Sequence, residues 1–417
     1  MQEILPPRIT GTEMEWSITV PLRNCGQPES SMAMNSCEAG DHVQYYLDRH
    51  MGYMGKNHDF YLANGARLYM DVGEHLEYAT PEDDSLMGTV ANEIAGEQLL
   101  RRVFEKAAAR PDSSLEEFSL NKRVIDDSGN VWGYHESYYS PGSAITISEA
   151  GLALLGVHLA TRNIFFGAGV LRPDGHYRIA QKAGRLNCDS NSGTMHTTVP
   201  VVNLRKEPLT AESVNGQRVH VTSGDATMSP WATFMKLGTT SLVLRLMEAG
   251  QHMEWLRLKQ SLKAVAAMVT HDTTLRTRLE LENGKRLYAH EIQEALLSEA
   301  RRLRGRRQLP EEEDMVLEEW QRAVDDAAED PLLLADRADW AGKLVRLRRY
   351  RERHGLKWND EELRRKDRQW DNIGPKGVGL IMRQTTWREW MPDQTLVDAR
   401  MATPPGTTRA AVRGHFI

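Results

Sequence analysis

Cysteine is scarce in this sequence: its 417 residues contain three, Cys25, Cys37 and Cys188, at irregular spacing. An odd, sparse set of cysteines excludes a disulfide framework and a cysteine-rich zinc site, and it fits a reducing cytoplasm. Extended apolar segments are also missing. The N-terminus has no apolar stretch of signal-peptide length, and the most apolar window, residues 144–160, is too short and too polar to span a membrane. We therefore expect a cytoplasmic protein without a membrane partner, in which residues 144–160 form a buried helix.

Neither acidic nor basic residues dominate, since the formal net charge is −6. This balance gives no argument for a nucleic-acid partner, and the two arginine-rich runs, residues 301–307 and 346–351, lack a pattern of interleaved stacking aromatics. We interpret these runs as solvated helix faces paired with nearby acids; the alternative is a docking strip for an acidic partner. No GxxxxGK[ST] loop occurs, and no GxGxxG is followed by a suitably spaced acid. A bound nucleotide would therefore lie on a sheet with metal ions rather than in a phosphate loop.

Hydrophobic periodicity divides the chain into an early strand-rich part and a later helical part. Strands are expected at residues 8–20, 131–139, 195–203 and 218–223 and as a hairpin over 58–72, and helices at 41–52, 87–109, 231–269 and from 286 onward with a break at 308–310. The hairpin has the turn signal Asn64-Gly65, whereas the Pro, Gly, Asn and Ser of residues 21–40 predict a mobile loop. Strands followed by long helices predict an α+β fold. We expect one large domain over residues 1–417, with its helical portion at about 231–370.

Two glutamates follow a glycine in the first predicted strand, within the run Gly11-Thr-Glu13-Met-Glu15. Alternate residues of a strand point to the same face, so Glu13 and Glu15 are expected side by side. Adjacent carboxylates repel each other unless a cation lies between them, and Mg²⁺, which takes oxygen ligands and often bridges to phosphates, is the natural partner. The alternative is a solvated strand face with two unrelated acids.

Further candidates for the same chemistry lie in residues 69–78 and 133–138. Tyr69 and Asp71 share a strand face. Asp71, at the end of this strand among metal-binding acids, is well placed as a general base that takes a proton from an amine or positions a water. The alternative is an acidic turn after the hairpin. His135, on a probable strand, is a candidate ligand for metal or phosphate, although a lone histidine is more often a structural residue.

Basic side chains recur around two later strands. Arg218 and His220 lie two residues apart on a predicted strand and therefore share a face, and Arg205 follows an earlier strand. The planar donor fork of arginine suits the clamping of a transferring phosphoryl group. The alternative reading of these residues is a surface salt bridge.

Several motifs in order along the chain resemble one family, that of Pup ligase and the Pup deamidase/depupylase. Residues 11–15 resemble the family's opening G-x-E-x-E, residues 64–80 resemble the Pup ligase signature, and His135-Glu136 resembles its H-E-N-Y element. Further similar segments are residues 161–162, 167–169, 202–208, 218–225, 236–244 and 403–414. The resemblance extends from about residue 8 to the last residue. Several motifs in matching order are far more specific than any one of them.

The resemblance implies a glutamine-synthetase-like fold, in which a curved antiparallel sheet cradles ATP and Mg²⁺ and helices pack behind it. A Pup ligase phosphorylates the C-terminal glutamate side chain of the small protein modifier Pup. A lysine of a protein substrate then forms an isopeptide bond that marks this substrate for the proteasome, and Asp71 would deprotonate the lysine. The implied metal ligands are Glu13, Glu15, Tyr69, Glu77 and His135, and the implied contacts to ATP phosphates are Arg205, Arg218 and His220.

The resemblance leaves alternatives to the ligase. In a deamidase/depupylase, Asp71 would attack or activate water in the same pocket. That branch carries a long insertion after the first strand, whereas residues 21–40 are only a short one, so we favour the ligase, although residues 339–358 look more like the depupylase branch. A small-molecule carboxylate–amine ligase and a non-catalytic binding protein are the other readings. The family's small C-terminal domain is expected to be absent, because the sequence ends at Ile417.

Overall fold

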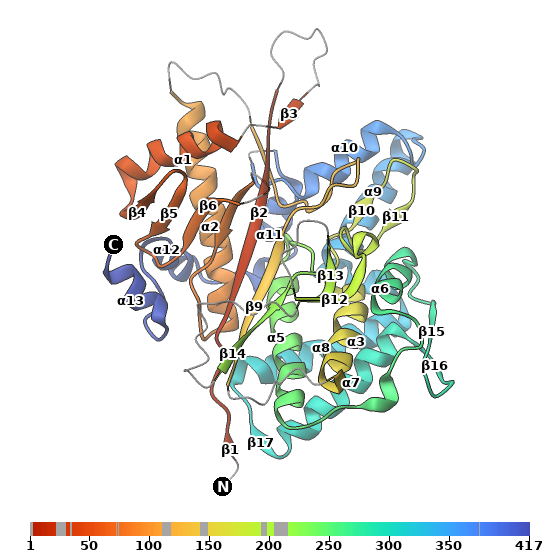
Figure 1. The fold of residues 1–417 in the computed structure, drawn as a ribbon. Coiled ribbons are helices and arrows are strands. Elements are labelled where there is room, and N and C mark those ends of the chain that lie inside the picture. Colours follow the sequence, from red (N-terminus) through yellow and green to blue (C-terminus); the bar gives the residue numbers. More distant parts are fainter. Residues whose placement is uncertain are drawn as a thin grey trace.

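A large sheet with helices packed on it forms the centre of the molecule, as Figure 1 shows. This computed structural model describes residues 3–21, 31–33, 36–71, 73, 75–110, 118–141, 149–192, 198–203, 216–374 and 376–417. Early strands and later helices appear in the expected order, which confirms the α+β prediction. None of the helices in these described ranges is long and apolar enough to cross a membrane.

The central sheet contains eleven strands. Across the sheet they are β12 (Cys188–Asn191), β13 (Pro200–Asn203), β14 (Gly216–Val221), β9 (Tyr134–Pro141), β2 (Thr10–Pro21), β7 (Leu76–Ala79), β6 (Arg67–Met70), β5 (Asp59–Leu62) and β4 (Tyr53–Lys56), while β3 (Ser31–Ala33) and β8 (Ser119–Asn121) also pair with β2. The described pairs are antiparallel apart from β12 and β13, which run parallel, so the sheet is mixed. Strand β2, with 12 residues, pairs with four other strands and joins the two halves of the sheet.

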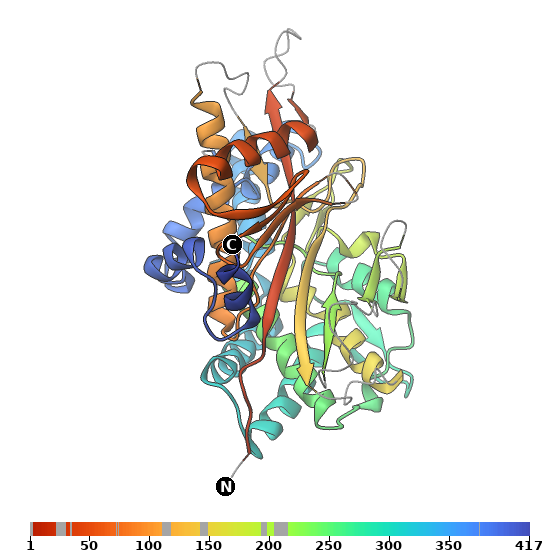
Figure 2. The same ribbon diagram turned by 60° about the vertical axis from the view of Figure 1, so that its left-hand side comes forward.

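Helices follow and cover this sheet (Figures 1 and 2). They are α1 (Ser36–His50), α2 (Leu86–Ala108), α3 (Glu149–Thr161), α4 (Asn163–Phe166), α5 (Pro230–Glu248), α6 (Leu262–His271), α7 (Ala289–Arg304), α8 (Glu311–Glu329), α9 (Asp339–His354), α10 (Glu361–Trp370), α11 (Val378–Gln384), α12 (Gln394–Ala402) and α13 (Arg409–His415). Short strand pairs are β1 (Glu3–Ile4) with β17 (Arg307–Gln308), β10 (Val170–Leu171) with β11 (Tyr177–Arg178) and β15 (Arg278–Glu280) with β16 (Arg286–Tyr288). Helices α2 and α5 contact the sheet and each other, so both lie on the same face of it.

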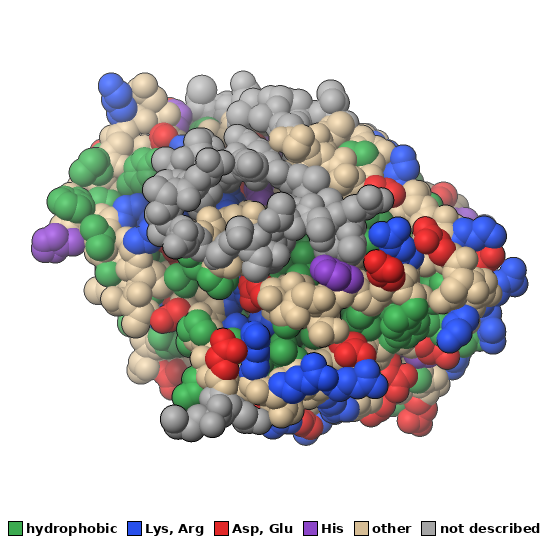
Figure 3. Space-filling view, turned by 60° about the horizontal axis from the view of Figure 1, so that its bottom comes forward, with side chains coloured by type: hydrophobic (Ala, Val, Ile, Leu, Met, Phe, Trp, Pro, Cys, Tyr) green, Lys and Arg blue, Asp and Glu red, His purple; other side chains and the backbone are tan. Residues whose placement is uncertain are grey.

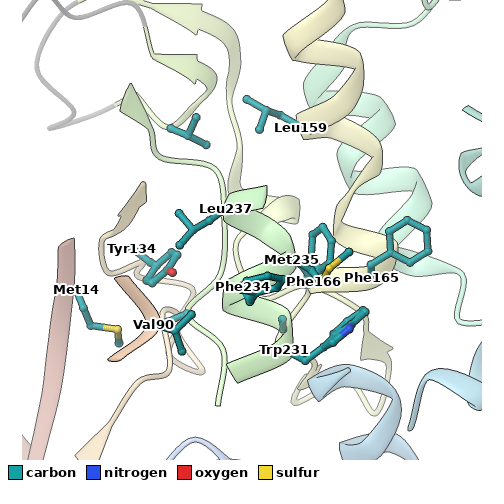
Figure 4. Packing of buried hydrophobic residues seen from close by; sticks show 14 of the residues in the cluster. Met14, Val90, Tyr134, Leu159, Phe165, Phe166, Trp231, Phe234, Met235 and Leu237 are labelled. Atoms are coloured by element: carbon teal, nitrogen blue, oxygen red, sulfur yellow. The ribbon is translucent and has the colours of Figure 1, made fainter. Parts of the chain in front are cut away.

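Helix α5 is the centre of the hydrophobic core. It begins at an N-cap, Ser229, whose side chain accepts a hydrogen bond from the Ala232 amide, and its residues 230–247 are all buried. Figure 4 shows its aromatic residues between the neighbouring elements, and the Trp231 and Phe166 rings lie 5.8 Å apart. A helix covered on all sides needs no polar face. Its packing fixes the sheet strands that carry the polar residues described below.

Three sequence predictions need correction. The range predicted for the mobile loop, residues 21–40, is too long, because residues 31–33 form β3 and α1 begins at Ser36. Residues 22–30 and 34–35 lie outside the described ranges. The single helix at 231–269 is wrong, because the chain turns after α5 at Gly250 and Met253, which both have positive φ, before α6 begins at Leu262. The strand at 195–203 is shorter, and β12 before it was not expected.

The hairpin and the apolar window agree with the predictions. Strands β5 and β6 flank Asn64-Gly65, and Gly65 has φ +81°. The buried part of residues 144–160 is helix α3, which begins at Glu149, while residues 142–148 lie outside the described ranges.

Replacement of Gly65 by alanine is expected to destabilise the protein by about 1–3 kcal/mol, because alanine is strained in the left-handed region. The new Cβ would also lie 3.0 Å from the Ala410 carbonyl oxygen in α13. The measurement is the midpoint of urea unfolding, with Gly406→Ala as the control, since a Cβ at Gly406 meets nothing within 4 Å. Equal midpoints for the two variants would contradict the expectation.

Part of the first arginine-rich run is paired with acids, as predicted. Arg302 forms an ion pair with Glu299, and Arg304 pairs with Asp314 and Glu318 of α8. Figure 3 shows acidic and basic side chains interspersed on the face that it presents. Exposed pairs of this kind contribute little stability, so this run is a solvated helix face.

A buried ion pair lies directly beneath the polar face of the sheet. Both nitrogens at the end of the Arg162 guanidinium donate to the Glu136 carboxylate, at 2.6 and 2.8 Å, and Nη1 also donates to Thr240 Oγ1 at 2.7 Å. The side chains of Arg162 and Glu136 are 1% and 0% exposed. Glu136 follows His135 on β9, so its side chain points to the opposite face, and this pair anchors the strand that carries His135.

Candidate functional site

The register of four strands, β2, β6, β7 and β9, brings five of the predicted polar residues onto one face of the sheet. Glu13 lies opposite His135 of β9, and Glu15 lies opposite Glu77 of β7. Glu77 in turn lies opposite Tyr69 of β6. Because directly opposite residues of an antiparallel pair point to the same face, these five side chains converge. Glu13 and Glu15, which the sequence predicts to lie side by side, are therefore part of a continuous polar surface.

One group of this surface surrounds Glu13. Its Oε2 lies 3.2 Å from His135 Nδ1 and 3.7 Å from His220 Nε2, while Arg218 Nη2 donates to Oε1 at 2.6 Å. Burial raises the pKa of Glu13, but the Arg218 charge and the His135 hydrogen bond outweigh it and hold this pKa well below its ordinary value. Arg218 also donates to Ser137 Oγ at 2.8 Å. Glu13 is therefore an ionised carboxylate beside one arginine and two imidazoles.

A second group surrounds Glu15 and Asp71. His75 Nδ1 lies 3.1 Å from Glu15 Oε2 and 3.9 Å from Asp71 Oδ1. The backbone amides of Gly73 and His75 donate to Asp71 Oδ1 at 2.8 and 3.1 Å, which holds its carboxylate at the end of β6. Burial, followed by the charge of Glu15, raises the pKa of Asp71 above its ordinary value. A carboxylate with a raised pKa is a stronger base.

Glu77 lies between the two groups and is 4% exposed. Burial and the charges of Glu13 and Glu15 raise the pKa of Glu77 well above its ordinary value. Burial and the charge of Glu77 likewise raise the pKa of Tyr69. Three carboxylates this close repel one another, and a bound cation would remove that repulsion. The carboxylates and the phenol also supply the oxygen ligands that Mg²⁺ takes, so these residues fit the predicted metal.

Two sets of side chains are close enough to hold a metal ion among the described residues. Their donor atoms lie within 4.8 Å of one another, and the sets are Glu13, His135 and His220, and Glu15, Asp71 and His75. The structure thus brings together eight of the nine predicted site residues. The ninth, Arg205, falls within residues 204–215, outside the described ranges.

Sequence reasoning assigned no role to His75 or to two buried lysines. His75 lies within residues 64–80, the segment that resembles the Pup ligase signature, and its spacing from Asp71 could have suggested a contact. Lys182 is 2% exposed; burial lowers its pKa, and the charges of Glu15 and Asp225 oppose this effect. Burial also lowers the pKa of Lys236 to about 8, and its Nζ donates to the Asp225 carbonyl oxygen at 2.5 Å. No local pattern indicates that a lysine is buried.

Comparison with known proteins places this geometry in a family. The profile of the family described as Pup-ligase protein matches residues 8–417. Two similar proteins, each named Pup--protein ligase, come from Acidimicrobium ferrooxidans and a Nocardioides species. The first is 35% identical, over 99% of this chain and 89% of the relative. The second is 34% identical, over 98% of this chain and 89% of the relative.

Solved structures agree with the sequence relatives. A complex between the prokaryotic ubiquitin-like protein Pup and its ligase PafA superposes with a TM-score of 0.83 at 28% identity, over 98% of this chain and 83% of that one. PafA in complex with ADP superposes with a TM-score of 0.75 at 26% identity, over 94% of this chain and 87% of that one. A glutamate–cysteine ligase from Francisella tularensis reaches a TM-score of 0.50 at 10% identity over 99% of this chain and 94% of that one, a likeness of fold alone. The present chain belongs to the Pup-ligase protein family.

Proposed function

We propose that the protein is an ATP-dependent ligase that attaches a Pup-like modifier to lysine side chains. In the proposed reaction, the C-terminal glutamate side chain of the modifier accepts the γ-phosphoryl group of ATP, which releases ADP. The lysine amine then displaces phosphate and forms the isopeptide bond. Relatives named Pup--protein ligase and a similar ligase bound to ADP support this proposal. The observation that carries it is the convergence of Glu13, Glu15 and Glu77 beside Asp71 on one sheet face.

Magnesium would be held by the oxygen ligands Glu13, Glu15, Glu77 and Tyr69 of this face. When bound, it would neutralise negative charge on the phosphates. Imidazole suits other metals better than Mg²⁺, so His220 fits better as a hydrogen-bond donor to phosphate. His135 lies beside Glu13, where it would either bind the metal or donate to phosphate. Arg205 and Arg218 would contribute charge to the transferring phosphoryl group.

Asp71 would act at the second step, as the base that removes a proton from the lysine ammonium. The raised pKa of Asp71 favours this proton transfer. Hydrogen bonds from the Gly73 and His75 backbone amides hold its carboxylate in place. The proposed ligand and base positions all come from one sheet, which supports a single catalytic unit. We also propose a cytoplasmic location, in keeping with the three sparse cysteines.

The test uses purified protein, Mg²⁺, ATP, a lysine-bearing acceptor protein and two synthetic modifiers that end in Glu or Gln. With the Glu form alone, we expect an adduct by mass spectrometry and a stoichiometric amount of ADP. Both products should be lost when excess EDTA removes the metal, and both should return when Mg²⁺ is added. Ammonia from the Gln form without an adduct would instead establish the deamidase. Adduct formation that withstands metal removal would contradict the proposed ligand set.

Replacement of His75 by alanine is expected to lower the adduct-forming rate by about 10–100-fold, the usual effect of losing a group that orients a metal ligand or base. The His75 ring lies between Glu15 and Asp71 and 5.4 Å from the Trp132 ring. His75→Asn should retain more activity, because its amide can still donate near the position of Nδ1. Steady-state rates at several Mg²⁺ concentrations measure both effects. Equal rates for His75→Ala and the wild type would exclude a positioning role.

A further inference from the structure

A pocket of about 500 Å³ lies between α9, α10 and α11, and no strand of the central sheet contributes to its lining. This volume is typical of sites for small organic ligands. Apolar side chains from all three helices form part of its wall, among them Leu347 of α9, Trp370 of α10 and Met382 of α11. The pocket is therefore separate from the proposed ligase site and presents an apolar surface to a ligand.

Three arginines line the same pocket along one stripe of α9. Arg346, Arg349 and Arg353 are spaced three and four residues apart, which places them on one face of the helix, and all three are exposed. Lys366 of α10 also lines the pocket. Like charges at this spacing repel one another, so the stripe has an electrostatic cost that a bound anion would remove.

These arginines differ from Arg302 and Arg304, which form ion pairs with acids. Within the ranges that the structure describes, no carboxylate lies within ion-pair distance of Arg346, Arg349 or Arg353. The recorded side-chain hydrogen bond of Arg346 goes to Met382 Sδ at 2.9 Å, and a thioether is a weak acceptor. Glu362 is engaged by the Tyr350 hydroxyl at 2.5 Å. Among the described residues, these three guanidinium groups thus have no carboxylate partner.

The buried cation of the pocket is already neutralised. Lys343 lines the wall but donates to both Asp371 carboxylate oxygens, at 2.9 and 3.1 Å, and to the Gly169 carbonyl oxygen. The uncompensated positive charge therefore resides at the rim, in the arginine stripe and Lys366, above an apolar wall. An anion with an apolar body matches this combination of positive charge and apolar wall better than a free inorganic ion does.

We propose that this pocket binds a small organic phosphate ester, whose dianionic phosphate contacts the arginine stripe and whose compact aromatic or aliphatic body contacts the apolar wall. Arginine presents parallel donors that match two phosphate oxygens, and several arginines together favour a dianion. The arginines line a pocket of about 500 Å³, a volume that suits a small molecule better than an acidic protein segment.

The probe for this proposal is 1-naphthyl phosphate, with 1-naphthol and inorganic phosphate as its two separated halves. Titration calorimetry on the full chain, without ATP or divalent metal, should show the ester binding at least about tenfold more tightly than either half, since both contacts are then made together. Arg349→Glu/Arg353→Glu should weaken ester binding by about tenfold or more. The matched control Arg306→Glu, an exposed arginine after α7, should leave it unchanged.

Each contrary result removes the proposal. Equal affinity of the double variant and the wild type would place the probe elsewhere, and 1-naphthol binding as tightly as the ester would make the site merely apolar. Displacement of the ester by a hexaglutamate peptide at lower concentration than by inorganic phosphate would assign the stripe to an acidic protein partner instead. Thermal unfolding of the double variant near the wild-type midpoint ensures that lost binding is not lost folding.

Discussion

Asp71→Asn is expected to lower the rate of isopeptide formation by about 10²–10⁴-fold, the range usual for the loss of a general base. Asparagine keeps the size of the side chain and an oxygen that can accept from the Gly73 and His75 amides, but it cannot take a proton from the lysine ammonium. In the proposed mechanism, the phosphoryl transfer to the modifier does not use this base. The variant should therefore still release ADP in the presence of the Glu-ended modifier, while adduct formation nearly stops.

Rapid-quench measurement of ADP and of adduct separates the two steps. Asp84→Asn, a half-buried aspartate in the turn before α2, is the matched control and should form adduct at the wild-type rate. Loss of both ADP and adduct in Asp71→Asn would show that the residue acts in phosphoryl transfer or metal binding. Retention of more than about a tenth of the adduct rate would exclude it as the base.

Arg162→Met is expected to cost about 3–5 kcal/mol of unfolding free energy, because it leaves the Glu136 carboxylate buried without its counter-charge. Glu136 would then retain the Tyr138 hydroxyl as its donor, at 2.5 Å. The double variant Glu136→Gln/Arg162→Met should be more stable than Arg162→Met alone, since no unpaired charge remains in the core. This order is opposite to that of two independent losses, which would add.

Urea unfolding midpoints and slopes for the two single variants and the double variant measure this coupling. Arg306→Met, on the surface, should change the unfolding free energy by no more than about 0.5 kcal/mol. A double variant that is less stable than Arg162→Met would contradict the argument. Because β9 also carries His135, the Mg²⁺ concentration needed for activity should rise in Arg162→Met.

The sequence predicts which residues of one strand share the polar face, but it does not predict which residues of neighbouring strands lie beside them. Alternation alone puts Glu13 beside Glu15, since strand geometry has a period of two. The contacts of Glu13 with His135 and His220 depend on strand register, which tertiary packing decides. Only the ordered motifs of the family connected those distant segments. The roles of the metal and phosphate contacts stay predictions.

Short sequence motifs predicted the structure correctly where the backbone conformation allows only certain residue types. Asn64-Gly65 predicts its turn because Gly65 takes a left-handed conformation there. The same conformation at Gly250 and Met253 went unrecognised, because a single glycine within a long periodic run is compatible with one continuous helix. Burial of Lys182 was invisible for a different reason: its environment comes from elements far away in the sequence.

The position of β2 at the junction of the sheet has a consequence for biosynthesis. Among the strands of the central sheet β2 comes first in sequence order, yet it pairs with β9 at residues 134–141, and β9 pairs with β14 at residues 216–221. Contacts of such long sequence separation form slowly and only after both partners exist. A nascent chain that ends before residue 216 therefore carries Glu13 and Glu15 but lacks β14, the strand that holds Arg218 and His220. The order of synthesis therefore delays assembly of the polar sheet face until β14 has been made.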